Sequence, residues 1–555
     1  NVIQEYELLY PLYRKANALQ LMYEHGKKDV RYLKASVQTY DFIIALIDRI
    51  KGNLTEESNF LFTEKIQDIF YHSIKTSLLA YEITKKPVFI ETTFKFIEKN
   101  KAAVLLSSIR SEDAIKFAGI SEESQRLEKT IKKRISAYKK QIFDQKNLTK
   151  PDERKINLWE SKLLYLHKSY DSLIARFGIE NPEYYALKYD TTVINISEIK
   201  NCIGKSKALI QYAVFDKEIF ISVITSDSSL IISKTVDSIF FHQIENLYKM
   251  FAVNMNNHNI DDFMTYILFS NNLYRLLFEP FTDIIKNKDL IIIPDGRLGY
   301  LPFETLITEI PDIDEIDYRS LPYLLKKHSV SYSYSSTLLF KNNLDSDIDD
   351  LKLLAFAPSY TNREAIENNS FIKNHNLSDY LIPLKQAKDE IDNISKIFKS
   401  TKCENSDASE KRFKELAPEY DILHLAMHTI LNDTAPMYSK LVFTPSGDDE
   451  QDIFLNTYEV YNLDLKARMV VLSACNTGSG KLQKGEGIMS LARGFLYCGV
   501  PSIIMTLWEV NDRSGAGIMT DFYKNLKKGL PKDKALQIAK LNYLENARQF
   551  MAHPF

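Results

Sequence analysis

The sequence predicts an α-helical repeat region followed by an α/β domain with a mostly parallel sheet. Three observations support this fold class. Apolar residues recur at helical spacing through about the first 190 residues, and after that point short apolar runs alternate with helical patterns. The chain also has only 17 Gly and 17 Pro in 555 residues, which favours long helices over an all-β sandwich, and its length exceeds what one hydrophobic core usually supports.

Composition excludes several classes of protein. Hydrophobic residues make up 45% of the chain and the net charge is −2, so a disordered chain is excluded and there is no bulk electrostatic case for nucleic acid or anionic lipid. The four cysteines are widely spaced and form no CxxC pair, which excludes a disulfide scaffold. No apolar run approaches the roughly 18 residues of a membrane span. We therefore expect a cytoplasmic protein without direct membrane contact.

Residues 1–190 are predicted to form antiparallel helix pairs that bind a partner. Two long helices meet at the turn around Pro151, and the charge run 132–134 is interpreted as a solvated helix face. Paired helices of this kind indicate an α-solenoid or a tetratricopeptide (TPR)-like array. The apolar positions of the second pair step by threes and fours or by sevens: Leu127, Ile131, Ile135, Tyr138 and Ile142, then Ile156, Leu163, Leu166, Tyr170, Leu173 and Phe177.

Residues 191–555 are predicted to form the α/β domain. Ala208 to Ile224 has the composition of a β-hairpin with its turn at Asp216 and Lys217. Buried strands that alternate with helices indicate a mostly parallel sheet covered on both faces. The expected strands are 290–293, 351–357, 422–426, 469–472 and 502–507, and the expected helices include 386–398, 408–416, 487–498 and 515–527.

Two of these strands end in residues that can carry out acyl transfer. The strand that begins at Asp421 ends in His428, and the strand that begins at Met469 ends in Cys475 with a glycine-containing turn behind it. The carboxyl ends of parallel strands meet at one rim of a sheet, where a histidine can take a thiol proton and backbone NH groups can bind an oxyanion. A cysteine at a strand end is also a common packing residue, so the pattern leaves both interpretations open.

Four segments resemble the CHAT domain, a caspase-fold module related to caspases and separases. The resemblance covers about residues 195–555, and helical repeats ahead of such a domain are a common family arrangement. The segments are His424-Leu-Ala-Met-His428, Val471-Leu-Ser-Ala-Cys-Asn-Thr-Gly478, the stretch 485–499, and Leu507-Trp-Glu-Val-Asn-Asp512. Upstream, Ile291-Ile-Ile-Pro-Asp-Gly296 and Leu301-Pro-Phe-Glu304 also match. The family pattern continues past His553-Pro554-Phe555, so we expect a chain truncated at both ends.

The resemblance implies a cysteine-type endopeptidase with a Cys-His dyad, in which Cys475 is the nucleophile and His428 the general base. His424 is interpreted as a strand residue, and no third triad member is evident. The backbone NH groups of Cys475 and Thr429 are the oxyanion-hole candidates. Thr429 stands where the family often has a small residue, and a β-branched residue resists positive φ.

Two carboxylates are candidates for the S1 pocket. Separases, which look similar here, place an acidic residue near this point to bind a basic P1 side chain, so Asp512 is favoured and Glu509 is the second choice. An equally weighted alternative makes Asp512 the cap of the helix that starts near Arg513. No cofactor and no metal are expected, because the His and Cys residues show no ligand spacing.

The predicted function is controlled cleavage of a specific protein partner, in a bacterial signalling or defence system. The helical region would receive a regulatory protein or a ribonucleoprotein complex, as members of the family it resembles do. The alternative is a catalytically silent adaptor or scaffold that only transmits partner binding.

Overall fold

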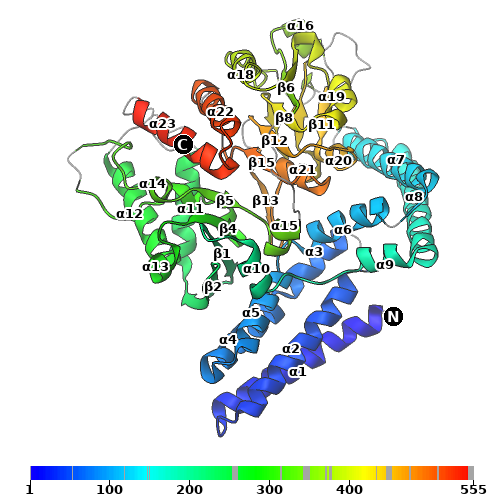
Figure 1. The fold of residues 1–555 in the computed structure, drawn as a ribbon. Helices are drawn as coiled ribbons and strands as arrows, with labels where there is room; N and C mark the ends of the chain where they lie inside the picture. Colours follow the sequence, from blue (N-terminus) through cyan, green and yellow to red (C-terminus); the bar gives the residue numbers. More distant parts are fainter. Residues whose placement is uncertain are drawn as a thin grey trace.

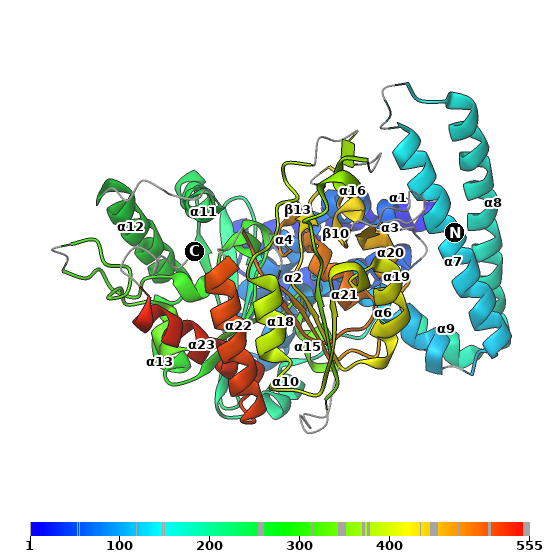
Figure 2. The same cartoon turned by 90° about the horizontal axis from the view of Figure 1, so that it is seen from above.

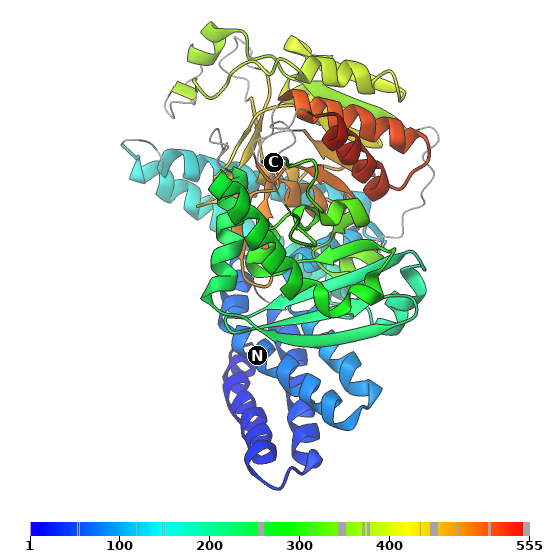
Figure 3. The same ribbon diagram turned by 90° about the vertical axis from the view of Figure 1, so that its left-hand side faces the viewer.

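The computed structural model confirms a helical region followed by an α/β region with an all-parallel sheet. It describes residues 2–547 except 53, 55, 118, 147, 149, 253–259, 313–314, 342–350, 369–371, 374–377, 433, 445–452, 474–476 and 509–511. In the views of Figures 1 and 3 the molecule has three tiers: the blue N-terminal helices, a green sheet with its helices, and a yellow-to-red α/β unit. Among the described residues, no helix is both long and apolar enough to cross a membrane.

The N-terminal tier consists of helices that pack as neighbouring pairs, namely α1 with α2, α4 with α5, and α7 with α8. Local signals set the helix ends: Asp29 and Asp152 accept hydrogen bonds from backbone NH groups in the first turns of α2 and α8. The turn predicted at Pro151 lies between α7 and α8. The helices are α1 (Val2–His25), α2 (Val30–Lys51), α3 (Glu56–Lys65), α4 (Gln67–Thr84), α5 (Pro87–Lys99), α6 (Ala103–Phe117), α7 (Glu122–Lys146), α8 (Glu153–Glu180) and α9 (Pro182–Lys188).

The middle tier contains a five-stranded sheet, sheet 1, with strand order β3-β2-β1-β4-β5. The predicted hairpin is confirmed, because β1 pairs antiparallel with β2, while β4 and β5 are parallel to β1. Its elements are α10 (Ile196–Cys202), β1 (Lys207–Val214), β2 (Glu218–Ile224), β3 (Ser229–Thr235), α11 (Ser238–Ala252), α12 (Ile260–Leu277), α13 (Thr282–Ile285), β4 (Asp289–Ile293), α14 (Leu324–Lys327), β5 (Val330–Tyr332) and α15 (Ser336–Lys341).

Sheet 1 is covered by different parts of the chain on its two faces. Helices α11 and α12 pack on one face, where Phe240 and Ile267 join the core beneath β1 and β2. The N-terminal helices cover the other face, and Ile47 and Phe70 lie in one apolar cluster with Phe220. The helical region therefore shares a hydrophobic core with the sheet and is not a detached arm.

The third tier contains sheet 2, an all-parallel sheet with strand order β15-β12-β8-β6-β7. Its apolar strands are covered on both faces, by α18 and α22 on one side and by α19 and α21 on the other. Its elements are β6 (Leu353–Ala357), α16 (Arg363–Asn368), α18 (Ala387–Ile394), β7 (Ser400–Glu404), α19 (Glu410–Leu416), β8 (Ile422–Leu425), α20 (Thr457–Val460), β12 (Met469–Leu472), α21 (Leu491–Tyr497), β15 (Ile503–Met505), α22 (Asp512–Lys527) and α23 (Lys532–Asn546).

Two small antiparallel sheets complete this tier. One has strand order β11-β10-β9, formed by β9 (Thr429–Ile430), β10 (Lys440–Val442) and β11 (Phe454–Asn456). The other is the hairpin of β13 (Gly480–Gln483) and β14 (Gly487–Ser490). The helix predicted for 487–498 is therefore too long, because 487–490 pair with β13 and Ser490 caps α21 by accepting a hydrogen bond from Arg493 N.

The α7–α8 hairpin lies beside the third tier (Figure 2). Phe143 stacks on Tyr438 with ring centroids 3.6 Å apart, and the Tyr438 hydroxyl donates to the carbonyl of Lys139. The Asn462 amide also donates to the Ser136 hydroxyl over 2.9 Å. The helical region thus contacts the third tier as well as sheet 1.

Candidate active site

His428 lies just beyond the carboxyl end of β8, the central strand of sheet 2. The strand ends at Leu425, and His428 follows three residues later, immediately before β9. Its side chain is buried, with 6% of the residue exposed. This is the rim where ligands of parallel α/β sheets bind, as the sequence predicts for this residue.

The imidazole of His428 is held in one tautomer. Nε2 lies 2.7 Å from the carbonyl oxygen of Ile382. A carbonyl only accepts hydrogen bonds, so in this pair Nε2 carries the hydrogen. In the neutral ring Nδ1 is then the nitrogen that can accept a proton, which is what a general base requires.

The backbone of His428 is fixed on both sides. Its NH donates to the Tyr360 hydroxyl over 3.1 Å, and that hydroxyl donates to the carbonyl of Val442 over 2.6 Å. Val442 N in turn donates to the carbonyl of His428 over 3.0 Å. Burial raises the pKa of Tyr360, so its hydroxyl stays protonated and keeps donating at neutral pH.

Two tyrosine rings limit the movement of the imidazole. The rings of Tyr360 and Tyr380 lie 4.6 and 5.5 Å from that of His428, measured between centroids. The Tyr380 hydroxyl donates to the carbonyl of Thr429 over 2.8 Å. These two tilted rings and the hydrogen bonds to Ile382, Tyr360 and Val442 together hold the base in a single orientation.

Cys475 lies outside the described residues, but the strand before it is described. β12 pairs with β8 in parallel, and Leu472 is aligned with Leu425. These aligned positions are 47 residues apart in sequence, which is also the separation of His428 and Cys475. The two strand ends that precede His428 and Cys475 by three positions therefore lie side by side at the same rim.

Hydrogen bonds fix the chain at Thr477 and Gly478, shortly after Cys475. Gly478 N donates to the carbonyl of Thr506 over 2.7 Å, and Thr506 N donates to the Thr477 hydroxyl over 3.3 Å. A Cβ on Gly478 would lie 2.8 Å from a methyl carbon of Leu507 and 3.1 Å from the Thr506 carbonyl oxygen, so a side chain here would force its neighbours to shift. The loop that includes Cys475 is thus anchored at Leu472 and at Gly478.

Thr429 lies in a strand, which removes the expected difficulty with its β-branched side chain. Thr429 is aligned with Leu441 of β10. The neighbouring residues Val442 and His428 are joined by a hydrogen bond from Val442 N to His428 O, so Thr429 and Leu441 form a non-hydrogen-bonded pair. In such a pair the NH and carbonyl of Thr429 point away from β10. Extended backbone suits a β-branched residue. The roles of Thr429 and Cys475 in an oxyanion hole stay predictions.

The S1 candidates also stay predictions. Glu509 lies outside the described residues. Asp512 is the first residue of α22, and its side chain lies outside the described part of the chain. Its place at the helix start is compatible with both interpretations offered above.

His424 is fully buried on β8, beside α18 and α22. It lies on β8 with no exposed surface, and its Nδ1 is 3.2 Å from the Tyr523 hydroxyl on α22. Its Nε2 approaches Glu390 Oε1 to 3.0 Å, without the geometry of a hydrogen bond. These contacts tie the strand to α18 and α22.

The three other cysteines differ in exposure. Cys202 is exposed at the end of α10, whereas Cys403 and Cys498 are buried. Burial raises the pKa of Cys403 to about 12, so this thiol stays protonated at neutral pH. Cys498 Sγ donates to the carbonyl of Phe495.

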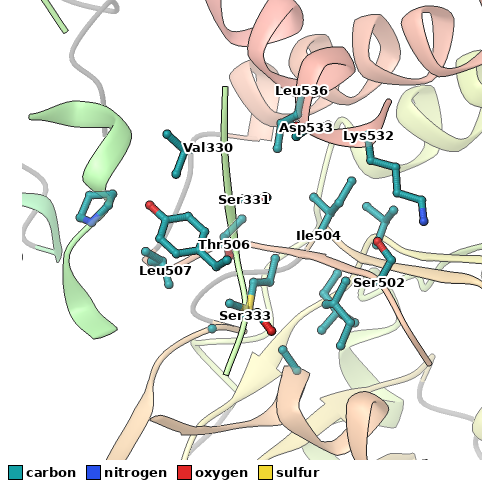
Figure 4. A pocket seen from close by; sticks show the side chains of 18 of the residues that line it. Val330, Ser331, Ser333, Ser502, Ile504, Thr506, Leu507, Lys532, Asp533 and Leu536 are labelled. Carbon is teal, nitrogen blue, oxygen red and sulfur yellow. The ribbon is translucent and has the colours of Figure 1, made fainter. Parts of the chain in front are cut away.

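A cavity of about 980 Å³ runs from the rim into the space between the two five-stranded sheets. His428, Ser473 and Gly478 line it at the rim. Its walls further in come from the outer strands of both sheets, with Ser331 on β5 and Ile504 on β15 (Figure 4). The described lining is mostly apolar, as in ligand-binding pockets generally.

Sequence reasoning missed the residues that orient His428. Ile382 contributes only a backbone carbonyl, which no side-chain motif can reveal. Tyr360 and Tyr380 lie in the connection after β6, far from His428 in the sequence. The only sign of these two tyrosines in the sequence is that they follow a predicted strand, because the carboxyl end of that strand lies at the same rim as His428.

An all-parallel sheet with helices on both faces and a histidine beyond its central strand defines an α/β protein with its candidate site at the carboxyl ends of the strands. The sequence profile of the CHAT domain matches residues 268–555, just over half of the chain. This chain therefore belongs to the CHAT domain family.

Individual relatives and a solved structure resemble this chain less strongly than the family profile does. Tetratricopeptide repeat protein 28 of Homo sapiens is 21% identical over 315 residues, covering 48% of this chain and 12% of the relative. The Mus musculus protein of that name is 26% identical over 104 residues, or 19% of this chain and 4% of the relative. This chain thus spans a small part of these relatives. A Saccharomyces cerevisiae separase–securin complex aligns with 98% of this chain and 47% of that chain, at 11% identity and a TM-score of 0.37.

Proposed function

We propose that this protein is a cysteine endopeptidase in which Cys475 is the nucleophile and His428 the general base. The observation that carries the proposal is the orientation of His428: Nε2 donates to the Ile382 carbonyl, which makes Nδ1 the basic nitrogen of the neutral ring. The strand register supports the pairing, since the aligned ends of β8 and β12 precede the two residues by equal distances. Family membership supports the class of chemistry.

The proposed reaction follows from these positions. Nδ1 of His428 takes the thiol proton of Cys475, and the thiolate attacks the carbonyl carbon of the scissile peptide bond. Backbone NH groups near Cys475 and Thr429 stabilise the oxyanion. The carbon–nitrogen bond breaks as His428 returns the proton to the leaving amine. Water then adds to the thioester, His428 takes its proton, and the released thiolate is reprotonated.

The proposal extends to the substrate, the partner and the cellular setting of this protein. The substrate is a specific protein, with Asp512 or Glu509 favouring a basic P1 residue. The helical region receives a regulatory protein or a ribonucleoprotein complex. The protein acts in the cytoplasm, as part of a bacterial signalling or defence system. The second candidate is an adaptor that transmits binding without cleavage.

Labelling by a peptidyl chloromethyl ketone with Arg at P1 tests the mechanism. We expect mass spectrometry of the full chain to find the adduct on Cys475, with none in Cys475→Ala. His428→Gln should slow labelling by roughly 100-fold or more, because the base is lost. An adduct that forms equally fast in His428→Gln would contradict the dyad. Absence of any adduct, even with the partner of the helical region added, would favour the adaptor.

A further inference from the structure

The β13–β14 hairpin connects the candidate active site with the N-terminal helices. It begins at Gly480, five residues after Cys475, and its tip reaches the turn between α5 and α6. Gly485 O accepts a hydrogen bond of 2.8 Å from Ala102 N, and Glu486 Oε1 accepts one of 2.9 Å from Val104 N. The second bond joins residues 382 positions apart.

Glu486 is buried at the first turn of α6. Only 1% of this residue is exposed, and its second carboxylate oxygen lies 2.7 Å from the guanidinium of Arg493 on α21. Arg493 is itself 2% exposed and lies over the ring of Tyr334. A carboxylate is favourable at a helix N-terminus, where free NH groups and the helix dipole attract negative charge. Glu486 thus ties α6 to the core around α21.

The backbone at the tip has no room for a side chain. Gly485 has φ +74°, and a Cβ there would lie 2.9 Å from Thr63 Cγ2 and 3.3 Å from the Asn100 carbonyl oxygen. Ala102 opposite also has a positive φ of 44°, which turns the chain between α5 and α6. Asn100 is held by paired amide hydrogen bonds of 3.1 Å with Gln67.

The other end of the hairpin adjoins the loop that includes Cys475. The Tyr300 hydroxyl donates to the Gly480 carbonyl over 2.8 Å, two residues after the anchor at Gly478. Four aligned pairs, from Gly480 with Ser490 to Gln483 with Gly487, make the hairpin a continuous ladder. A displacement at its tip is therefore carried along paired strands to the anchor of the loop.

We propose that Glu486 is a positioning residue through which the helical region controls the nucleophile loop. With the tip docked on α6, the hairpin steadies the anchor at Gly478, three residues after Cys475. A partner that moves the α5–α6 turn releases the hairpin and changes the reactivity of Cys475. The part concerning reactivity rests on the proposed function, whereas the mechanical link does not.

The first test variant loosens the tip without removing a charge. In the full chain, Gly485→Ala adds a methyl group against Thr63 and Asn100. Gly529→Ala is the matched control, because Gly529 has φ +84° and a Cβ there meets nothing within 4 Å. Thr63→Ser, which removes the obstructing methyl carbon, is combined with Gly485→Ala as a rescue. Glu486→Gln keeps an oxygen for Val104 N but removes the charge opposite Arg493.

Two measurements are made on each variant: amide hydrogen exchange over 477–490, and the rate at which the peptidyl chloromethyl ketone labels Cys475. We expect Gly485→Ala and Glu486→Gln to speed exchange and slow labelling by roughly tenfold or more, since small displacements of reacting groups are costly. Gly529→Ala should change neither the exchange rate nor the labelling rate. In the Gly485→Ala background, Thr63→Ser should return both rates most of the way to their wild-type values.

The two possible failures are distinguishable. Unchanged hydrogen exchange over 477–490 in both tip variants would overturn the link between hairpin and helices. The link would also be overturned if Gly529→Ala and Gly485→Ala changed exchange and labelling equally, or if Thr63→Ser did not rescue Gly485→Ala. Either result would show that backbone strain causes the change. A wild-type chain that is never labelled at Cys475 would overturn the proposed function, while the exchange measurement still decides the link.

Discussion

At the scale of single residues, the site depends on how tightly His428 is oriented. The tautomer is set by a backbone carbonyl, and the peptide NH is held by the Tyr360 hydroxyl. That hydroxyl is shared, since it also donates to the Val442 carbonyl. One buried oxygen atom therefore satisfies two backbone groups beside the proposed base.

Tyr360→Phe tests this arrangement. The change leaves a buried NH and a buried carbonyl without the hydroxyl, so we expect the free energy of unfolding to fall by about 2 kcal/mol. Urea denaturation should show a lower midpoint, and labelling of Cys475 should slow because the base is less well held. Tyr165→Phe, at a residue 69% exposed on α8, is the control and should leave both unchanged. A wild-type midpoint for Tyr360→Phe would refute the bridging role.

At the scale of elements, helix ends join the tiers of the molecule. Glu98, near the end of α5, is 2% exposed and accepts hydrogen bonds from Ser336 N and Thr337 N in the first turn of α15. It also accepts a hydrogen bond from the Gln211 amide on β1. A carboxylate of the helical region therefore holds both a strand and a helix of the middle tier.

Glu98→Ala should consequently be strongly destabilising. The substitution removes three hydrogen bonds to a charged acceptor and leaves their donors buried, so the loss should be about 3 kcal/mol or more. The unfolding midpoint in urea measures it, with Glu82→Ala at an exposed position of α4 as the control. If both variants unfold at the wild-type midpoint, the interface does not depend on this contact.

At the scale of the whole molecule, the helical region and sheet 1 share one hydrophobic core. Apolar side chains of α2, α4 and α5 lie in the same cluster as Leu209, Phe220 and Ile291 on the sheet. Removing the helices would expose this face to water, and each large apolar side chain exposed costs about 1.5–3 kcal/mol.

A fragment of residues 191–555 tests this unity. We expect it to bind the dye ANS and to elute as aggregates in size-exclusion chromatography, whereas the full chain elutes as a discrete species. The reason is the uncovered face of sheet 1. A fragment that is monodisperse and unfolds cooperatively would show instead that the predicted boundary at 190/191 separates two independent domains.

The predictable part of the fold came from local patterns. Helical periodicity predicted α7 and α8 and the turn at Pro151, and short apolar runs predicted β4, β6, β8, β12 and β15. The β13–β14 hairpin was not predicted, because its glycines permit either a helix start or a turn and only cross-strand pairing decides between them. For the same reason the division of the strands into two sheets was not visible in the sequence.

The sequence by itself determined the class of fold, the family, and the two residues proposed for chemistry, because strand periodicity and a conspicuous motif are local properties of the chain. Only the tertiary structure decided which nitrogen of His428 is the base and which residues orient it. It also placed Glu486 at the start of α6. These features depend on backbone carbonyls and helix ends that meet across as many as 382 residues, and such contacts leave no pattern in the local sequence.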